Sequence, residues 1–151
     1  MACNDYEWTP TTHDDILKVV VWFQNKFNLR DWNVTVDTSL IPPSKFKEDE
    51  DEEEEKALAR CHPVLRRLRA LIWVPLERLE KNDVNAISST IHEMLHVFVT
   101  ARGVDVDSAD DNNAEECAVF SLEMPLFQLY CLEHGIKLPE LRKDVWAKLK
   151  V

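Results

Sequence analysis

The stretch from Asp83 to Val99 constrains the fold of this chain more than any other. Its large apolar residues recur three or four positions apart, which predicts a helix with one buried face: Val84, Ile87, Ile91, Leu95 and Phe98. Asn82 or Asp83 is the expected N-cap of this helix. Gly103 is the expected residue just beyond its C-terminal end.

This helix carries the motif His92-Glu93-Met94-Leu95-His96. The two histidines lie one turn apart and project from the same side, so their imidazoles can hold one zinc ion. Glu93 lies beside them, where it can take a proton from a metal-bound water. The alternative is a helix with two hydrogen-bonded histidines. The glutamate between them and the apolar flanks favour the metal site.

The pattern of the whole chain predicts an α+β fold built as a single domain of residues 1–151. Thr12 followed by Asp15 resembles a capping box and starts an N-terminal helix that runs to about Asn28. Three short segments with alternating apolar residues predict a small sheet of three strands: 32–37, 57–64 and 67–74.

A second long helix is expected to start near Asn112 or Asn113, to be kinked or broken at Pro125, and to end near Glu133. A C-terminal amphipathic helix from Leu138 to Lys150 is expected to follow. The acidic segment 47–56 contains eight consecutive Asp and Glu residues, which predicts a solvated loop.

The net charge of −10 argues against a nucleic-acid partner and against an anionic membrane surface. The longest apolar run, Val19 to Phe23, is far too short to span a bilayer. The first residues lack the pattern of a secretory signal, and the four cysteines show no CxxC spacing. These features together predict a cytoplasmic protein with reduced cysteines.

Two histidines leave a zinc site short of one protein ligand. No further histidine follows His96 within the helix, so a carboxylate from another element is expected. The second long helix offers Glu115 and Glu116. Small side chains on the same helix would let it approach the motif helix closely: Ala114, Ala118 and Ser121.

With these residues in view, the chain resembles a small gluzincin, a zinc peptidase with HExxH on one helix and a glutamate ligand on the next. It is most similar to minigluzincins and to the HExxH peptidase-like proteins of phages and mobile elements. The matching segments are Trp32–Val36, Leu68–Val74, His92–His96 and Glu115–Glu123. The resemblance implies a zincin-like fold with one zinc ion.

The resemblance also assigns roles to residues. His92, His96 and Glu116 would bind the zinc. Glu116 follows His96 at a spacing similar to that of thermolysin-like enzymes and is preferred over Glu115, although a difference of one residue in the connecting loop would exchange them. Glu93 would be the general base of a zinc metalloendopeptidase that hydrolyses peptide bonds of a protein or peptide substrate.

Three further expectations follow from the same resemblance. The strand Leu68–Val74 would form the edge of the cleft, on which an extended peptide adds as another strand. Tyr130 and His134 are the candidates for stabilising the oxyanion. His13 and His62 are isolated from the motif in the sequence and, for that reason, are expected to be structural. The basic C-terminal segment 136–151 would either cover the cleft and keep the enzyme latent or simply cover the core.

Two other functions fit the motif. One is a gluzincin-like zinc-binding domain that acts by binding a partner, with little or no hydrolysis. The absence of a clear oxyanion donor supports this alternative. The other is a deformylase-like zinc hydrolase, which fits less well because no cysteine-bearing ligand motif precedes the HExxH sequence.

Overall fold

The computed structural model describes residues 11–49, 59–103 and 109–136. Within these ranges the chain forms four α-helices and a three-stranded sheet, in the order α1, β1, β2, β3, α2, α3, α4. Short 3₁₀ helices cover Ser44–Asp49 and Leu65–Arg67. The predicted α+β class is therefore confirmed.

Helix α1 (His13–Lys26) begins at the predicted capping box. The backbone amide of Thr12 donates to Oδ2 of Asp15 over 2.8 Å, and the amide of Asp15 donates back to Oγ1 of Thr12 over 3.2 Å. These two bonds satisfy amides that the first helical turn leaves without partners. The buried face of the helix is Ile16, Val19, Val20, Trp22 and Phe23.

The sheet has the order β1–β3–β2, with β1 at Asn33–Asp37, β2 at Arg60–Val64 and β3 at Arg69–Trp73. Strand β1 pairs with β3 in parallel, and β2 pairs with β3 in antiparallel orientation. The prediction that the 68–74 strand forms the cleft edge is therefore wrong, because β3 is paired on both sides. Strand β2 is at the edge, where Pro63, which has no N–H to donate, is tolerated.

Helix α3 (Ala86–Ala101) carries the HExxH motif and starts later than predicted. Its N-cap is Asn85, whose Oδ1 accepts hydrogen bonds from the amides of Ile87 and Ser88. Asn82 instead ends a separate short helix, α2 (Leu76–Lys81), and the intervening Asp83 has a left-handed backbone with φ of 54°. Beyond the other end, Gly103 has φ of 76°, as its predicted place past the helix end requires.

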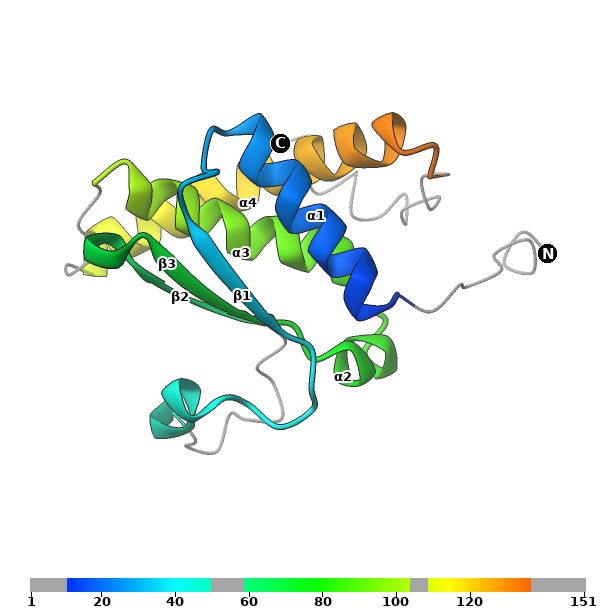
Figure 1. Cartoon of the computed structure of the whole chain (residues 1–151), viewed down its shortest axis with the longest axis horizontal. Coiled ribbons are helices and arrows are strands. Elements are labelled where there is room, and N and C mark those ends of the chain that lie inside the picture. Colours follow the sequence, from blue (N-terminus) through cyan, green and yellow to red (C-terminus); the bar gives the residue numbers. More distant parts are fainter. Residues whose placement is uncertain (1–10, 50–58, 104–108, 137–151) are drawn as a thin grey trace.

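Helix α3 lies at the centre of the described structure, in contact with α1, α4, β2 and β3 (Figure 1). Its residues Ile91, Met94, Leu95 and Val97 are almost completely buried. Because α3 is covered from several directions, its position relative to the edge strand β2 and to α4 is fixed by packing.

Helix α4 (Ala109–Glu133) continues through Pro125, so of the predicted kink or break at this residue the break does not occur. Proline removes one backbone hydrogen bond, to the carbonyl of Ser121, and strains the turn before it. The helix nevertheless continues because buried residues hold it on both sides of Pro125: Val119, Phe127, Tyr130 and Cys131. It also begins before the predicted Asn112 or Asn113.

Several expectations fall on parts of the chain that are not described. The acidic segment at 47–56 lies largely outside the described residues, and the C-terminal segment after Ile136 lies wholly outside them. The described cysteines, Cys61, Cys117 and Cys131, are free thiols. Among the described helices, none combines the length and apolar character needed to cross a membrane.

Candidate metal centre

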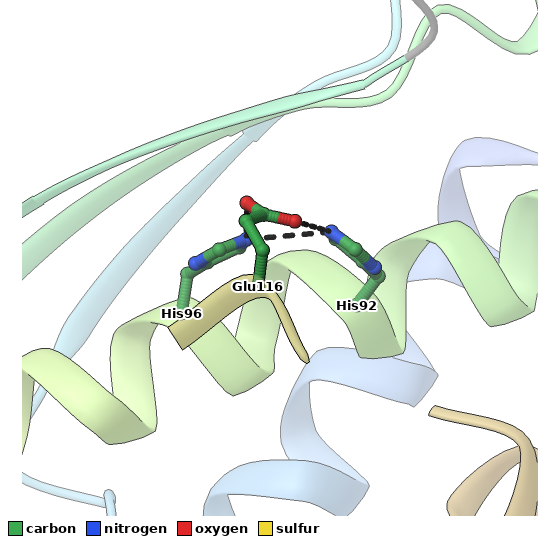
Figure 2. Close-up of side chains that lie close together, drawn as sticks. All are labelled: His92, His96 and Glu116. Atoms are coloured by element: carbon green, nitrogen blue, oxygen red, sulfur yellow. Dashed lines mark hydrogen bonds and ion pairs between the residues drawn. The ribbon is translucent and has the colours of Figure 1, made fainter. Parts of the chain in front are cut away.

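Three side chains from two helices converge at one point above α3. Figure 2 shows the imidazoles of His92 and His96, one turn apart on α3, directed toward the carboxylate of Glu116 on α4. One ligand atom from each of the three lies within 4.8 Å of the others. The group is therefore compatible in geometry with one metal ion, and its members are the residues that the sequence singled out.

The distances within this group leave the three side chains close enough to share one ion. Nε2 of His92 and Nε2 of His96 are 3.3 Å apart. Two nitrogens that are each about 2.05 Å from a tetrahedral zinc ion lie about 3.3 Å from each other. Oε1 of Glu116 is 3.0 Å from Nε2 of His96, and the other carboxylate oxygen, Oε2, is 3.7 Å from Nε2 of His92.

The other ring nitrogen of each imidazole, Nδ1, lies close to a second carboxylate. Nδ1 of His92 lies 3.2 Å from Oε1 of Glu123, and Nδ1 of His96 lies 3.0 Å from Oε1 of Glu115. When Nδ1 carries the proton, it donates to the carboxylate and leaves Nε2 with a lone pair. Both lone pairs then face the common point, which suits a shared proton or a metal cation.

The charge around His92 changes its pKa in two opposing ways. Burial alone would lower the pKa of the imidazole, because it disfavours the charged form. The hydrogen bond to Glu123 and the negative charges of Glu93 and Glu116 outweigh burial, so the pKa of His92 is raised. The site is thus electrostatically suited to positive charge.

Glu93 is turned inward and is only 7% exposed. Burial raises the pKa of its carboxyl group to about 7, although the neighbouring His92 and His96 oppose this shift. A carboxyl group with this pKa exchanges a proton readily near neutral pH, which is what a general base requires.

A cavity of about 530 Å³ lies between α3, α4 and the edge strand β2, and it is lined by His92, Glu93, His96, Glu115 and Glu116. Its wall on the β2 side is formed by residues 59–63, and Lys45, Phe46 and Thr100 complete the lining. His62 was expected to be structural, and the structure places it in this wall. No residue pattern along the chain indicates this position, because only the pairing of β2 with β3 brings His62 to the cavity.

Cys61 also forms part of this wall. Burial raises the pKa of its thiol well above the ordinary range, and the negative charges of Glu93 and Glu115 raise it further. The thiol therefore stays protonated at neutral pH and contributes a small, weakly polar surface to the cavity.

The two predicted oxyanion candidates lie elsewhere. Tyr130 is buried, with its ring 5.1 Å from that of Trp22, and His134 stacks on Tyr130 at 4.1 Å. Neither residue lines the described cavity. Tyr130 lies in the last turns of α4, and His134 follows the end of this helix at Glu133. The packing of Trp22 of α1 against Tyr130 gives Tyr130 a core role.

Sequence reasoning missed Glu123, and treated Glu115 only as a possible ligand. Glu123 follows Glu116 by two helical turns and therefore shares its face of α4, which is a signal that the sequence does contain. For Glu115, by contrast, the contact with His96 depends on how α4 rotates against α3.

Comparisons of the chain with protein-family models, with curated proteins and with solved structures give no match in any of the three.

Proposed function

We propose that this protein is a zinc metallopeptidase with a gluzincin-like site, in which His92, His96 and Glu116 bind the ion. The observation that carries the proposal is the meeting of two Nε2 atoms and one carboxylate at 3.0 to 3.7 Å, with the buried Glu93 in the same cavity. A motif with HExxH on one helix and a glutamate on the next is what this peptidase class requires.

A zinc ion bound at this point would supply a Lewis acid for the substrate carbonyl and would lower the pKa of a water molecule. The chain supplies the proton transfer. Glu93 accepts a proton from the attacking water at its carboxylate and then returns it to the leaving nitrogen of the peptide. Burial supports this role, because it holds the pKa of Glu93 at about 7.

Strand β2 is the proposed docking edge for the substrate. It pairs with β3 on one side only, and its residues form one wall of the cavity. An extended peptide that adds to the other side of β2 would lie across the cavity, with backbone hydrogen bonds for affinity. Pro63 has no N–H to donate, so it contributes only its carbonyl group to such pairing.

The alternative function is metal-dependent binding of a partner protein without hydrolysis. The observation that favours it is the position of Tyr130 and His134 outside the cavity lining, which removes both expected oxyanion donors. The two functions share the metal site and differ in the need for Glu93 as a base.

The test combines metal content with hydrolysis. Elemental analysis of the folded native chain is expected to give about one zinc per chain, retained in Glu93→Gln and strongly reduced in Glu116→Ala. A mixed peptide library should be cleaved by the native protein and left intact by Glu93→Gln. Glu77→Gln on the exposed α2 is the matched control and should behave like the native protein.

Each part of the result has a separate meaning. If native protein offered zinc at micromolar concentration binds none, both functions fail. If zinc binds but neither the native protein nor Glu93→Gln cleaves any peptide, the peptidase proposal fails and the binding function stands.

A further inference from the structure

Positive charge is concentrated at the turn between β2 and β3, although the chain as a whole is negatively charged. The chain has a net charge of −10, yet no acidic residue occurs between Arg60 and Trp73. Arg66, Arg67 and Arg69 in this segment are all exposed. None of the ion pairs formed within the described ranges involves any of these three arginines.

Two exposed leucines accompany these arginines: Leu65 precedes Arg66, and Leu68 lies between Arg67 and Arg69. Leu65 is 44% and Leu68 is 39% exposed, so residues 65–69, which we call the arginine turn, present both apolar and cationic side chains. Immediately before β1, Arg30 and Asp31 are also exposed, and their charges cancel. The surplus charge at this end of the sheet therefore belongs to the arginine turn.

The turn is held in a conformation that leucine rarely adopts. Leu68 has a left-handed backbone with φ of 48°. Its amide donates to the carbonyl of Leu65 over 3.2 Å, and its own carbonyl accepts from the amide of Asn33 over 2.8 Å. Backbone strain at an exposed apolar residue is a feature that often accompanies a binding surface. The sheet thus presents the turn in one fixed shape.

The turn also lies in line with the proposed cleft. Strand β2 lines the cavity as far as Pro63 and ends at Val64, and the arginine turn begins with the next residue. A peptide that extends along β2 in this direction would pass from the cavity to Arg66 within three or four residues.

We propose that the arginine turn binds an acidic segment of the peptide substrate as it leaves the cleft along β2. The term substrate rests on the proposed function, whereas the binding of an acidic peptide does not. Guanidinium groups pair with carboxylates through two parallel hydrogen bonds, and the exposed leucines suit apolar side chains between the acids. A nucleic acid fits less well, because a chain with a net charge of −10 repels a long polyanion more than a short acidic segment.

The experiment measures binding by fluorescence anisotropy, with a labelled peptide of alternating Glu and Leu and a matched peptide of alternating Gln and Leu. Metal-free full-length protein is used, so that neither zinc nor cleavage enters the result. Arg66→Glu/Arg67→Glu is expected to weaken binding of the acidic peptide about tenfold and to leave the Gln peptide unchanged. Lys18→Glu/Lys81→Glu changes the net charge equally on α1 and α2, and should alter binding less than twofold.

Three outcomes would overturn the proposal. These are equal weakening by the two charge-reversed variants, no preference for the acidic peptide over the Gln peptide, and equally tight binding of a single-stranded oligonucleotide of the same length. If Arg66→Glu/Arg67→Glu does not give a native circular dichroism spectrum, the double glutamine variant replaces it, with an expected loss of about threefold. These results test the binding of an acidic peptide even if the protein is not a peptidase, because none of them requires hydrolysis.

Discussion

Replacing Glu123 by alanine is expected to weaken zinc binding about tenfold, although this residue is not one of the proposed ligands. Carboxylates that hold the outer nitrogen of a ligating histidine typically contribute ten- to a hundredfold in metal affinity. Oε1 of Glu123 is 3.2 Å from Nδ1 of His92, and its side chain is 18% exposed. Because solvent partly screens this contact, we expect the lower end of the range, about 1.4 kcal/mol.

Glu115 should contribute more than Glu123. Its Oε1 lies 3.0 Å from Nδ1 of His96, and only 5% of its side chain is exposed. Glu115→Ala is therefore expected to weaken zinc binding about a hundredfold, or about 2.8 kcal/mol. The glutamine variants retain a hydrogen-bond acceptor and should each lose less than the corresponding alanine variant.

The assay is competition for zinc against a chromophoric chelator at fixed pH. Nitrogen NMR of the imidazoles in metal-free protein provides a second measurement, since loss of Glu123 should shift His92 away from the Nδ1-protonated tautomer. Glu77→Ala, which removes only an exposed pair with Lys81, is the control. Zinc affinity of Glu123→Ala within twofold of native, with an unchanged tautomer, would refute the reasoning.

Three other predictions concern stability. The hydrogen bond from Lys26 lowers the pKa of Glu133, so this carboxylate stabilises the fold above its unfolded-state pKa, and the contribution is lost as the pH falls through the lower folded-state value. Glu133→Gln should therefore destabilise the protein in urea titrations at pH 7 and have no effect at strongly acid pH. Leu68→Asn should raise the free energy of unfolding by ~0.5–1 kcal/mol, because asparagine tolerates φ of 48° better than leucine. Thr12→Ala should lower it by ~1 kcal/mol, because the cap to Asp15 is lost.

A specific result would contradict each of these three stability predictions. A pH-independent loss in Glu133→Gln would mean that packing rather than charge is responsible. Destabilisation by Leu68→Asn would show that the exposed leucine contributes more by its contacts than its backbone costs. An unchanged Thr12→Ala midpoint would mean that the start of α1 is frayed in solution.

Local patterns in the sequence predicted the elements well. Thr12 and Asp15 form the capping box, and Gly103 ends the motif helix, because capping chemistry acts between residues close in the chain. The N-cap of α3 was misplaced because Asn82 and Asn85 are equivalent by residue type. Only the extra helix α2, which uses Asn82 at its end, decides between them.

The arrangement of the elements in space was harder to predict from the sequence. Alternation of side chains in β2 and β3 gives each strand two faces but no place in the sheet, so the edge was assigned to the wrong strand. His62 belongs to the cavity wall for the same reason. The continuous helix through Pro125 depends on buried contacts on both sides of it, which a local rule for proline does not include.

The contact between Trp22 and Glu133 has a consequence for synthesis of the chain. The indole N–H of Trp22 donates to Glu133 over 3.1 Å, across a sequence separation of 111 residues. At about 5 to 20 residues per second, a ribosome needs about 6 to 22 s to cover this distance. During that interval Trp22 of the newly made α1 lacks Tyr130 and Glu133, its partners on α4, because they have not yet been translated. Vectorial synthesis thus leaves this part of the first helix exposed until α4 has been made.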